Sequence, residues 1–307
     1  MEFHIILRVF ALFFCAILKG SSASLWAEVY WQSMLASTPL PKALQELLQP
    51  ANAGSNVSFS YEKDETPQSG ARVGYGVGYW PDKREFDKNV VYNETTVYFI
   101  YDDLIPNKKM TLIFTKSMEN SNFLPRKLAQ SIPFSSNKLP NILKHFSIQP
   151  TSKKAQIMKQ TIEECEAPGI KGEEKKCATS LESLVDIVVL KYGKNVRTLM
   201  NEAEEENKKQ EYTVLEGIKM MGENPIVCHK ERYPFAIYYC HTIMGTKAYM
   251  VPLVGDDGSK AKAAVVCHTK TSAWNPQHVA FQVLKVKPGG PPVCHFLNSD
   301  TIVWIPN

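Results

Sequence analysis

The sequence predicts an α+β fold: a mainly antiparallel sheet carrying four Cys-His pairs, with a helical hairpin, preceded by an extended propeptide. Three observations predict it. From residue 212 onward, short runs of β-branched and aromatic residues alternate with turn-forming residues, which is typical of strands. Between residues 155 and 193, apolar residues recur at helical spacing. Residues 24–96 are rich in Pro, Gly and Ser and show little periodicity.

Residues 1–23 have the organisation of a secretory signal peptide. Arg8 is followed by ten apolar residues and then by Ser21-Ser22-Ala23. The apolar run is well short of the roughly 20 residues that span a bilayer. We therefore expect the secretory pathway, with an extracellular, cell-wall or vacuolar destination and no membrane attachment after cleavage. Cleavage removes Cys15 and leaves six of the seven cysteines in an oxidising compartment, where disulfides are expected.

The charge of the chain indicates no charged partner. The formal net charge of +4 falls to +3 without Glu2, Arg8 and Lys19. No block rich in Lys and Arg with interleaved aromatic residues suggests a nucleic-acid-binding face. We expect no nucleic-acid partner.

Residues 24–96 are interpreted as a leader with one short helix at residues 42–48. Two sequons, at Asn56 and Asn93, fit a secreted, glycosylated surface. Residues 73–80 contain Tyr75-Gly76-Val77-Gly78 and, two residues on, Trp80. A mobile aromatic turn is the simpler interpretation. However, a polar tail has no evident use for two tyrosines and a tryptophan so close together, so this stretch is a candidate core peptide.

Residues 97–307 are long enough to form one domain with its own core. Two apolar runs, at 97–101 and 110–114, predict a hairpin around a Pro/Asn-marked loop. Two helices are predicted between residues 155 and 193, both packing on the core. Thr179 and Glu182 have the spacing of a capping box for the second helix, and Gly193 ends it.

Cys165 and Cys177 flank the loop between these two helices. A disulfide there would fix the helical hairpin and stabilise it by about 3 kcal/mol. The alternative is a pair of buried free thiols. The charged residues 201–210 are interpreted as a solvated helix face without a binding role.

The remaining residues predict a mainly antiparallel sheet. A short helix is expected around residues 277–282, after Asn275-Pro276. The predicted strands are 212–219, 226–229, 235–241, 247–254, 261–268, 283–287 and 293–296.

Four of these strands contain the same dipeptide at or next to their end. Ten, twenty-five and twenty-five residues separate the successive copies, which are Cys228-His229, Cys240-His241, Cys267-His268 and Cys294-His295. Successive side chains of a strand point to opposite faces, so each histidine faces away from its neighbouring cysteine. A sheet with four such pairs gathers imidazoles on one side and sulfurs on the other.

Four neutral imidazoles that converge form a nitrogen site for Cu(II) or, less favourably, Zn(II). The candidate ligands are His229, His241, His268 and His295. The cysteines opposite them would form two disulfides, and three pairings are open. The competing interpretation is a thiolate zinc module, which needs reduced cysteines. His278 lies outside the pairs and is interpreted as an ordinary helix residue.

The spacing of the four Cys-His dipeptides resembles that of the plant BURP-domain family. The resemblance covers the chain from about Val97 to the C-terminus, and Val303-Trp304-Ile305-Pro306 resembles the family's usual ending. In the leader, Tyr30-Trp31-Gln32-Ser33 and Thr38-Pro39-Leu40-Pro41 resemble the "unknown seed protein" branch of legumes.

Tyr75-Gly76-Val77-Gly78 with Trp80 resembles the core of lyciumin-type cyclic peptides, Gln-Pro-Tyr-Gly-Val-Gly-x-Trp. In that group a BURP domain cyclises a core carried in its own precursor. The resemblance implies a bond from the Trp80 indole nitrogen to the Gly76 α-carbon. It also implies a copper centre at the four histidines, dioxygen as oxidant, the chain's own propeptide as substrate, and proteases that process it.

The chain departs from that pattern at Val73-Gly74, which stands where the cyclic peptides have Gln-Pro. A product released here could not form an N-terminal pyroglutamate at that place. The alternative function is a non-enzymatic secreted seed or cell-wall protein in which copper is structural or absent.

Overall fold

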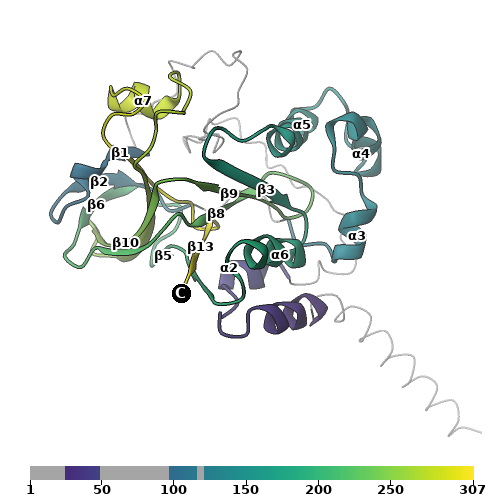
Figure 1. Cartoon of the computed structure of the whole chain (residues 1–307), viewed down its shortest axis with the longest axis horizontal. Helices are drawn as coiled ribbons and strands as arrows, with labels where there is room; N and C mark the ends of the chain where they lie inside the picture. The colour runs from purple at the N-terminus through teal and green to yellow at the C-terminus, as the bar shows by residue number, and fades with distance from the viewer. Residues whose placement is uncertain (1–24, 49–96, 116–120) are drawn as a thin grey trace, which may run out of the picture.

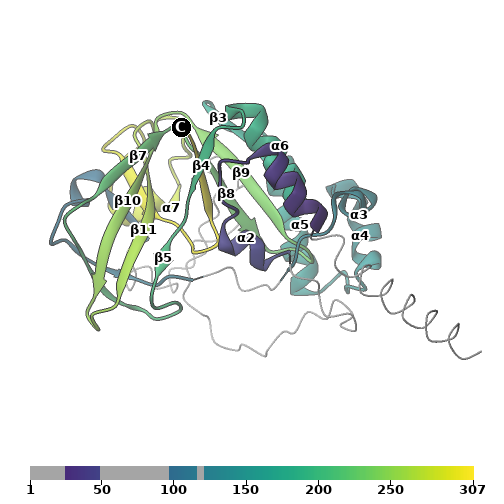
Figure 2. The same ribbon diagram turned by 90° about the horizontal axis from the view of Figure 1, so that it is seen from below.

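The computed structural model describes residues 25–48, 97–115 and 121–307, which form two antiparallel sheets and several helices (Figure 1). Turned by 90°, one sheet lies to the left, the second in the middle, and helices α3 to α6 to the right (Figure 2). The predicted signal peptide, the core peptide at residues 73–80, and both sequons lie outside the described residues.

Sheet A, the larger of the two, has eight strands, and its main path runs β1-β12-β11-β10-β6-β2. β5 pairs with β11 and β7 pairs with β10 at its margins. Its strands are β1 (Tyr98–Ile100), β2 (Lys109–Leu112), β5 (Glu202–Ala203), β6 (Gln210–Val214), β7 (Lys219–Glu223), β10 (Thr246–Gly255), β11 (Lys260–His268) and β12 (Val293–Phe296).

Sheet B has five strands in the order β3-β9-β8-β13-β4. Its central strands are apolar along most of their length, which is typical of strands covered on both faces. The strands are β3 (Glu173–Ala178), β4 (Val196–Leu199), β8 (Ile226–Glu231), β9 (Ile237–Ile243) and β13 (Ile302–Pro306).

The helices cover sheet B on one side and one end of sheet A. α6 buries Leu184, Val185 and Val188 against sheet B, and α7 packs beside β1. The α-helices are α2 (Lys42–Glu46), α3 (Arg126–Ser131), α4 (Leu139–His145), α5 (Lys153–Glu166), α6 (Leu181–Tyr192) and α7 (Val279–Leu284), with short 3-10 turns at Tyr101–Asp103 and Ser136–Lys138. None of the helices in the described part of the chain has the length and apolar character that crossing a membrane requires.

Most predicted strands are present, but their pairing differs from expectation at one place. β1 and β2 were predicted to form a hairpin with each other. Instead β1 pairs with β12 and β2 pairs with β6. Both runs are strongly apolar, and local pattern alone does not identify a strand's partner. The segment 283–287, predicted as a strand, lies at the end of helix α7 and the turn after it.

The helical hairpin is interrupted by a strand that the sequence did not indicate. The charged residues before Cys177 form β3, which pairs along β9 between the two helices. The capping box of α6 is one residue later than predicted, with Ser180 and Ser183 in the two roles. Gly193 does end the helix, and its φ of +73° is a conformation that suits glycine. Residues 201–210 form no helix, and β5 lies among them.

Residues 25–48 are folded rather than extended. Residues 25–34 are helical, and α2 confirms the short helix predicted near residue 42. Trp31, Leu35 and Leu44 have no exposed surface and belong to the same apolar cluster as α6 and Trp304. Pro and Gly content did not reveal this packing, because it depends on a partner surface far away in the sequence.

Candidate metal centre

The four cysteines of the Cys-His dipeptides form two disulfides. Cys228 on β8 lies directly opposite Cys240 on β9, and Cys267 on β11 lies directly opposite Cys294 on β12. Each opposed pair is bonded. The expected bond between Cys165 and Cys177 is also present, joining α5 to β3. No thiolate is left among these cysteines, so the structure contradicts the thiolate zinc module.

The register of each ladder puts the histidines of one pair on the same face. His229 is aligned with Tyr239, and His241 is aligned with Val227, so the two imidazoles are diagonal neighbours. His268 and His295 have the same relation on β11 and β12. Because side chains alternate along a strand, these imidazoles point away from the disulfide between their neighbours. The predicted separation of nitrogen and sulfur is therefore confirmed.

The two histidine pairs lie on different sheets, whereas the sequence predicted one sheet. Val227 shares a face of β8 with His229, and Val266 shares a face of β11 with His268. Both valines belong to one buried cluster formed by residues of sheets A and B. The imidazole-bearing faces of the two sheets therefore face each other. The disulfides lie on the outer sides, each in the core of its own sheet.

Within each pair the Nε2 atoms approach closely. They are 3.3 Å apart for His229 and His241, and 3.4 Å apart for His268 and His295. In the described part of the chain, no group of three or more His, Cys, Asp or Glu side chains is arranged to hold a metal ion. The four imidazoles are thus organised as two pairs, which differs from the single cluster we expected.

In the first pair, the Nδ1 atoms are held by an acidic and a hydroxyl side chain. His241 Nδ1 donates to Glu173 Oε1 over 2.9 Å. A carboxylate only accepts hydrogen bonds, so the neutral form of His241 has its proton on Nδ1 and a lone pair on Nε2. His229 Nε2 then donates to His241 Nε2, and its Nδ1 accepts from the Thr301 hydroxyl at 3.4 Å.

The second pair repeats this arrangement with different partners. His295 Nδ1 donates to the carbonyl oxygen of Phe296 over 3.3 Å, which fixes a lone pair on its Nε2. His268 Nε2 donates to that atom, and its Nδ1 accepts from the Thr246 hydroxyl at 2.9 Å. In each pair, one imidazole bonds at Nδ1 to a group that can only accept a hydrogen bond. The other imidazole bonds at Nδ1 to a hydroxyl, which can donate or accept one.

The surroundings of His229, His268 and His295 favour the neutral form of these three imidazoles. Burial lowers the pKa of His229 and of His268 well below the usual value for histidine, and the neighbouring imidazoles lower each pKa further. Burial lowers the pKa of His295 to about 4, against a smaller opposing effect of its hydrogen bond to Phe296. This effect acts between the two pairs as well, because His268 and His295 lower the pKa of His229. Neutral imidazoles are the form that binds metal ions.

Glu173 is a buried carboxylate that contacts the first pair at His241. Burial raises its pKa, but hydrogen bonds from His241, the Ile170 backbone and the Tyr239 hydroxyl outweigh this effect, and the net pKa is lowered. Glu173 is therefore ionised at neutral pH. The Tyr239 hydroxyl donates to the same oxygen at 3.1 Å.

The spacing within each pair fits two ligands of one metal ion. Two nitrogen ligands about 2.0–2.1 Å from a zinc ion in tetrahedral geometry lie roughly 3.3 Å apart. Hydrogen bonds to the opposite ring nitrogen are the usual support of metal-binding histidines. The spacing suits both pairs, and His241 and His295 also meet the hydrogen-bond criterion, so each pair could supply two nitrogen ligands to a metal ion such as copper.

His278 caps the start of α7, whereas the sequence predicted a residue within the helix. Its Nδ1 accepts a hydrogen bond from the Ala280 backbone at the start of α7. It packs against Trp274, which in turn contacts the His268 ring. Glu173, Thr246 and Thr301 were missed by the sequence analysis. A lone charged or hydroxyl residue in a polar stretch carries no pattern, so no sequence signal could have identified them.

Comparison with known proteins assigns the family. The model of the BURP domain matches residues 97–306. The chain belongs to the BURP-domain family. The matched region contains both imidazole pairs, all three disulfides, Glu173 and the two hydroxyl partners.

Several curated BURP proteins are similar to this chain. BURP domain protein RD22 of Arabidopsis thaliana is 46% identical over 74% of this chain and 62% of its own length. BURP domain-containing protein 5 of Oryza sativa subsp. japonica is 41% identical over 93% of this chain and 88% of its own. Protein RAFTIN 1B of Triticum aestivum is 32% identical over 94% and 92%. The chain thus spans less than two thirds of the length of the Arabidopsis protein.

Proposed function

We propose that this BURP-domain protein is a copper-dependent peptide cyclase that joins the Trp80 indole nitrogen to the Gly76 α-carbon in its own leader. The observation that carries the proposal is the arrangement of the four imidazoles. All four are positioned by hydrogen bonds at Nδ1 and directed at one another through Nε2. The candidate substrate is the stretch Tyr75-Gly76-Val77-Gly78 with Trp80.

The reaction has a defined balance of atoms. The indole N–H bond of Trp80 and one α-C–H bond of Gly76 break, and one N–C bond forms between them. Two electrons and two protons leave and reduce one dioxygen to hydrogen peroxide. Bound copper would supply the one-electron redox chemistry that connects the peptide to dioxygen. Glycine has no side chain, so its α-carbon is accessible. Any other residue at position 76 would obstruct attack at that carbon.

The chain's own residues prepare the nitrogens for a metal ion. His241 and His295 already present a lone pair at Nε2, because Glu173 and the Phe296 carbonyl hold their protons at Nδ1. His229 and His268 have to move one proton each, from Nε2 to Nδ1. Their hydroxyl partners, Thr301 and Thr246, permit that change because a hydroxyl can turn from donor to acceptor. The lowered pKa values of His229, His268 and His295 mean that these three imidazoles need not lose a charge first.

Rigidity supports the same proposal. The disulfide behind each histidine pair holds its two strands in register, so the Nε2 atoms keep their spacing. A site that serves two redox states of copper functions best when its ligands need not rearrange. Because substrate and domain share one chain, the local concentration of the core peptide is set by the tether and not by diffusion.

The test is a mass measurement on the full-length secreted chain. Purified protein is incubated with Cu(II) in air and digested, and the peptide containing Trp80 is weighed. We expect the loss of two hydrogens and a fragment ion series in which residues 76–80 do not separate. An unchanged mass contradicts the proposal. Gly76→Ala and Trp80→Phe should each abolish the bond, whereas Tyr79→Phe, which alters neither bonded atom, should retain it.

A non-enzymatic seed or cell-wall protein is the second candidate. The observation that favours it is that the imidazoles already satisfy one another by hydrogen bonds, which suits a purely structural role. Replacing His268 by Ala separates the two functions. Loss of the crosslink with unchanged thermal stability supports the cyclase. A large fall in thermal stability, with no crosslink in the wild-type chain, supports the structural role.

A further inference from the structure

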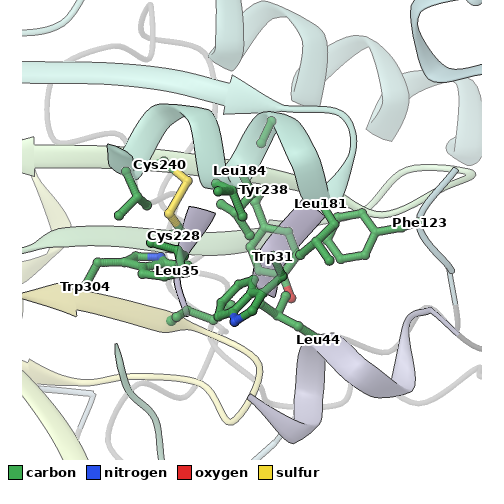
Figure 3. Packing of buried hydrophobic residues seen from close by; sticks show 14 of the residues in the cluster. Trp31, Leu35, Leu44, Phe123, Leu181, Leu184, Cys228, Tyr238, Cys240 and Trp304 are labelled. Carbon is green, nitrogen blue, oxygen red and sulfur yellow. A yellow bond between two sulfur atoms is a disulfide. The ribbon is translucent and has the colours of Figure 1, made fainter. Parts of the chain in front are cut away.

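Residues 25–48, here called the N-terminal clamp, are built into the core of sheet B. The helix at residues 25–34 lies beside α6 in both views (Figures 1 and 2). Trp31 packs on Trp304, with ring centroids 5.5 Å apart. Figure 3 shows Trp31, Leu35 and Leu44 in one cluster with the disulfide between Cys228 and Cys240. The clamp therefore covers the sulfur side of the first histidine pair.

Polar contacts fix the clamp at several points along its length. The Trp31 indole donates to the Thr38 carbonyl at 2.8 Å, and the Thr38 hydroxyl donates to the carbonyl of Val196 at the start of β4. The Phe123 backbone donates to the Leu47 carbonyl at 2.9 Å, close to the end of the clamp. These bonds give the clamp one register on the domain.

The middle of the helix is held by a cluster of polar and charged side chains around Tyr30. The Tyr30 hydroxyl donates to Asp186 on α6, and Arg126 lies over the Tyr30 ring at 4.9 Å from its centroid. Arg126 and Asp186 are themselves an ion pair at 2.8 Å. The clamp thus contacts α3, α6, β4 and β13, all of which follow residue 97 in the sequence.

Both ends of the segment 49–96 are consequently attached to the same body. Leu48 is buried in the core of sheet B, and Val97 packs in the cluster around Tyr98 and α7. All the contacts of the clamp described above are made by residues outside 49–96. A cut inside that segment removes none of them.

We propose that the N-terminal clamp is a permanent subunit of the domain, which stays bound after proteolysis within residues 49–96. The processed protein is then a non-covalent complex of two chains. In this complex, the amphipathic clamp binds the apolar surface formed by α6 and Trp304 of the same protein. Release of the candidate core peptide at 73–80 therefore requires two cuts, because after one cut each piece still carries a part that is bound to the domain. The proposal is independent of copper and of the crosslink.

The experiment uses the full secreted chain with a protease recognition sequence inserted after Gln68. No cysteine lies in residues 24–96, so only non-covalent contacts can hold the cut pieces together. After complete cutting, the pieces are run on a size-exclusion column at micromolar concentration. We expect co-elution in buffer and separation in guanidinium chloride. Separation in buffer overturns the proposal.

A second measurement tests whether the described interface is responsible. The cut chain carrying Trp31→Ala with Leu35→Ala should lose the N-terminal piece on the same column. The matched control carries Trp26→Ala with Val29→Ala, whose side chains are 70% and 49% exposed on the same helix, and should still co-elute. Retention of the Trp31 and Leu35 variant, or loss of the control, contradicts the assigned interface. The mass of the peptide that contains Trp80 tests the cyclase, and co-elution tests the retained clamp. Failure of one proposal therefore does not decide the other.

Discussion

The two histidine pairs share one local geometry and differ in their surroundings. In each, two cysteines lie directly opposite each other on paired strands. The two histidines are diagonal neighbours on the other face, with nearly the same distance between their Nε2 atoms. The first pair is fully buried and held by a carboxylate, Glu173. The second has the partly exposed His295 and a carbonyl in place of the carboxylate, and its aromatic neighbours are Trp274 and Tyr98 where the first pair has Tyr239.

The comparison shows that the spacing of the nitrogens and the position of the protons have different structural causes. The antiparallel ladder sets how far apart the nitrogens lie, because diagonal neighbours have a fixed spacing. The surrounding side chains set which nitrogen carries the proton and how strongly each ring is held. A carboxylate stabilises its imidazole partner more than a carbonyl does, since charge-assisted hydrogen bonds are roughly twice as strong as neutral ones. We therefore expect the first pair to bind a metal ion more tightly.

The largest predicted effect comes from removing the element that both pairs share, the disulfide. Replacing Cys228 and Cys240 together by Ala, or Cys267 and Cys294 together, should each lower the free energy of unfolding by about 3 kcal/mol, from loop closure. The second should cost slightly more, because its loop is 27 residues long against 12. Guanidinium unfolding measures both. Equal stability of wild type and variants would show that strand pairing alone maintains the register.

The next effect distinguishes the two pairs. Glu173→Gln keeps the shape of the side chain but removes the charge that holds His241, and copper affinity should fall 10- to 100-fold at the first pair. Titration calorimetry with Cu(II) measures it. Glu174→Gln is the matched control, because that neighbour is exposed and forms an ion pair with Lys191. If both variants bind as wild type does, Glu173 does not orient a metal ligand.

A smaller effect compares the two hydroxyl partners. Thr246→Val removes a hydrogen bond of 2.9 Å to His268 and should cost about 1 kcal/mol of unfolding free energy. Thr301→Val removes a longer contact of 3.4 Å to His229 and should cost less. Urea unfolding of the two metal-free variants gives the order. The reverse order would mean that Thr301 is the more important partner.

The smallest effect tests the boundary of the second pair. His278→Asn retains a side chain that can cap α7, so stability should change by less than about 0.5 kcal/mol. Copper affinity should not change, since His278 makes no hydrogen bond to either histidine of the pair in the described structure. A clear loss of copper affinity would add His278 to the site.

The sequence by itself determined the features that depend on neighbours along the chain. Alternation along a strand fixes that the imidazole of His229 points away from the sulfur of Cys228, whatever the strand packs against. The short loop between Cys165 and Cys177 made their disulfide predictable, and the strand ends before each Cys-His dipeptide were visible as apolar runs.

Tertiary structure decided everything that depends on partners far apart in the sequence. It separated the dipeptides into two facing sheets, chose one disulfide pairing out of three, brought Glu173 to His241, and folded Trp31 onto Trp304. None of these contacts has a local signal, because each results from long-range burial and strand pairing. Local pattern specifies the direction in which a side chain points, and only packing specifies what it meets there.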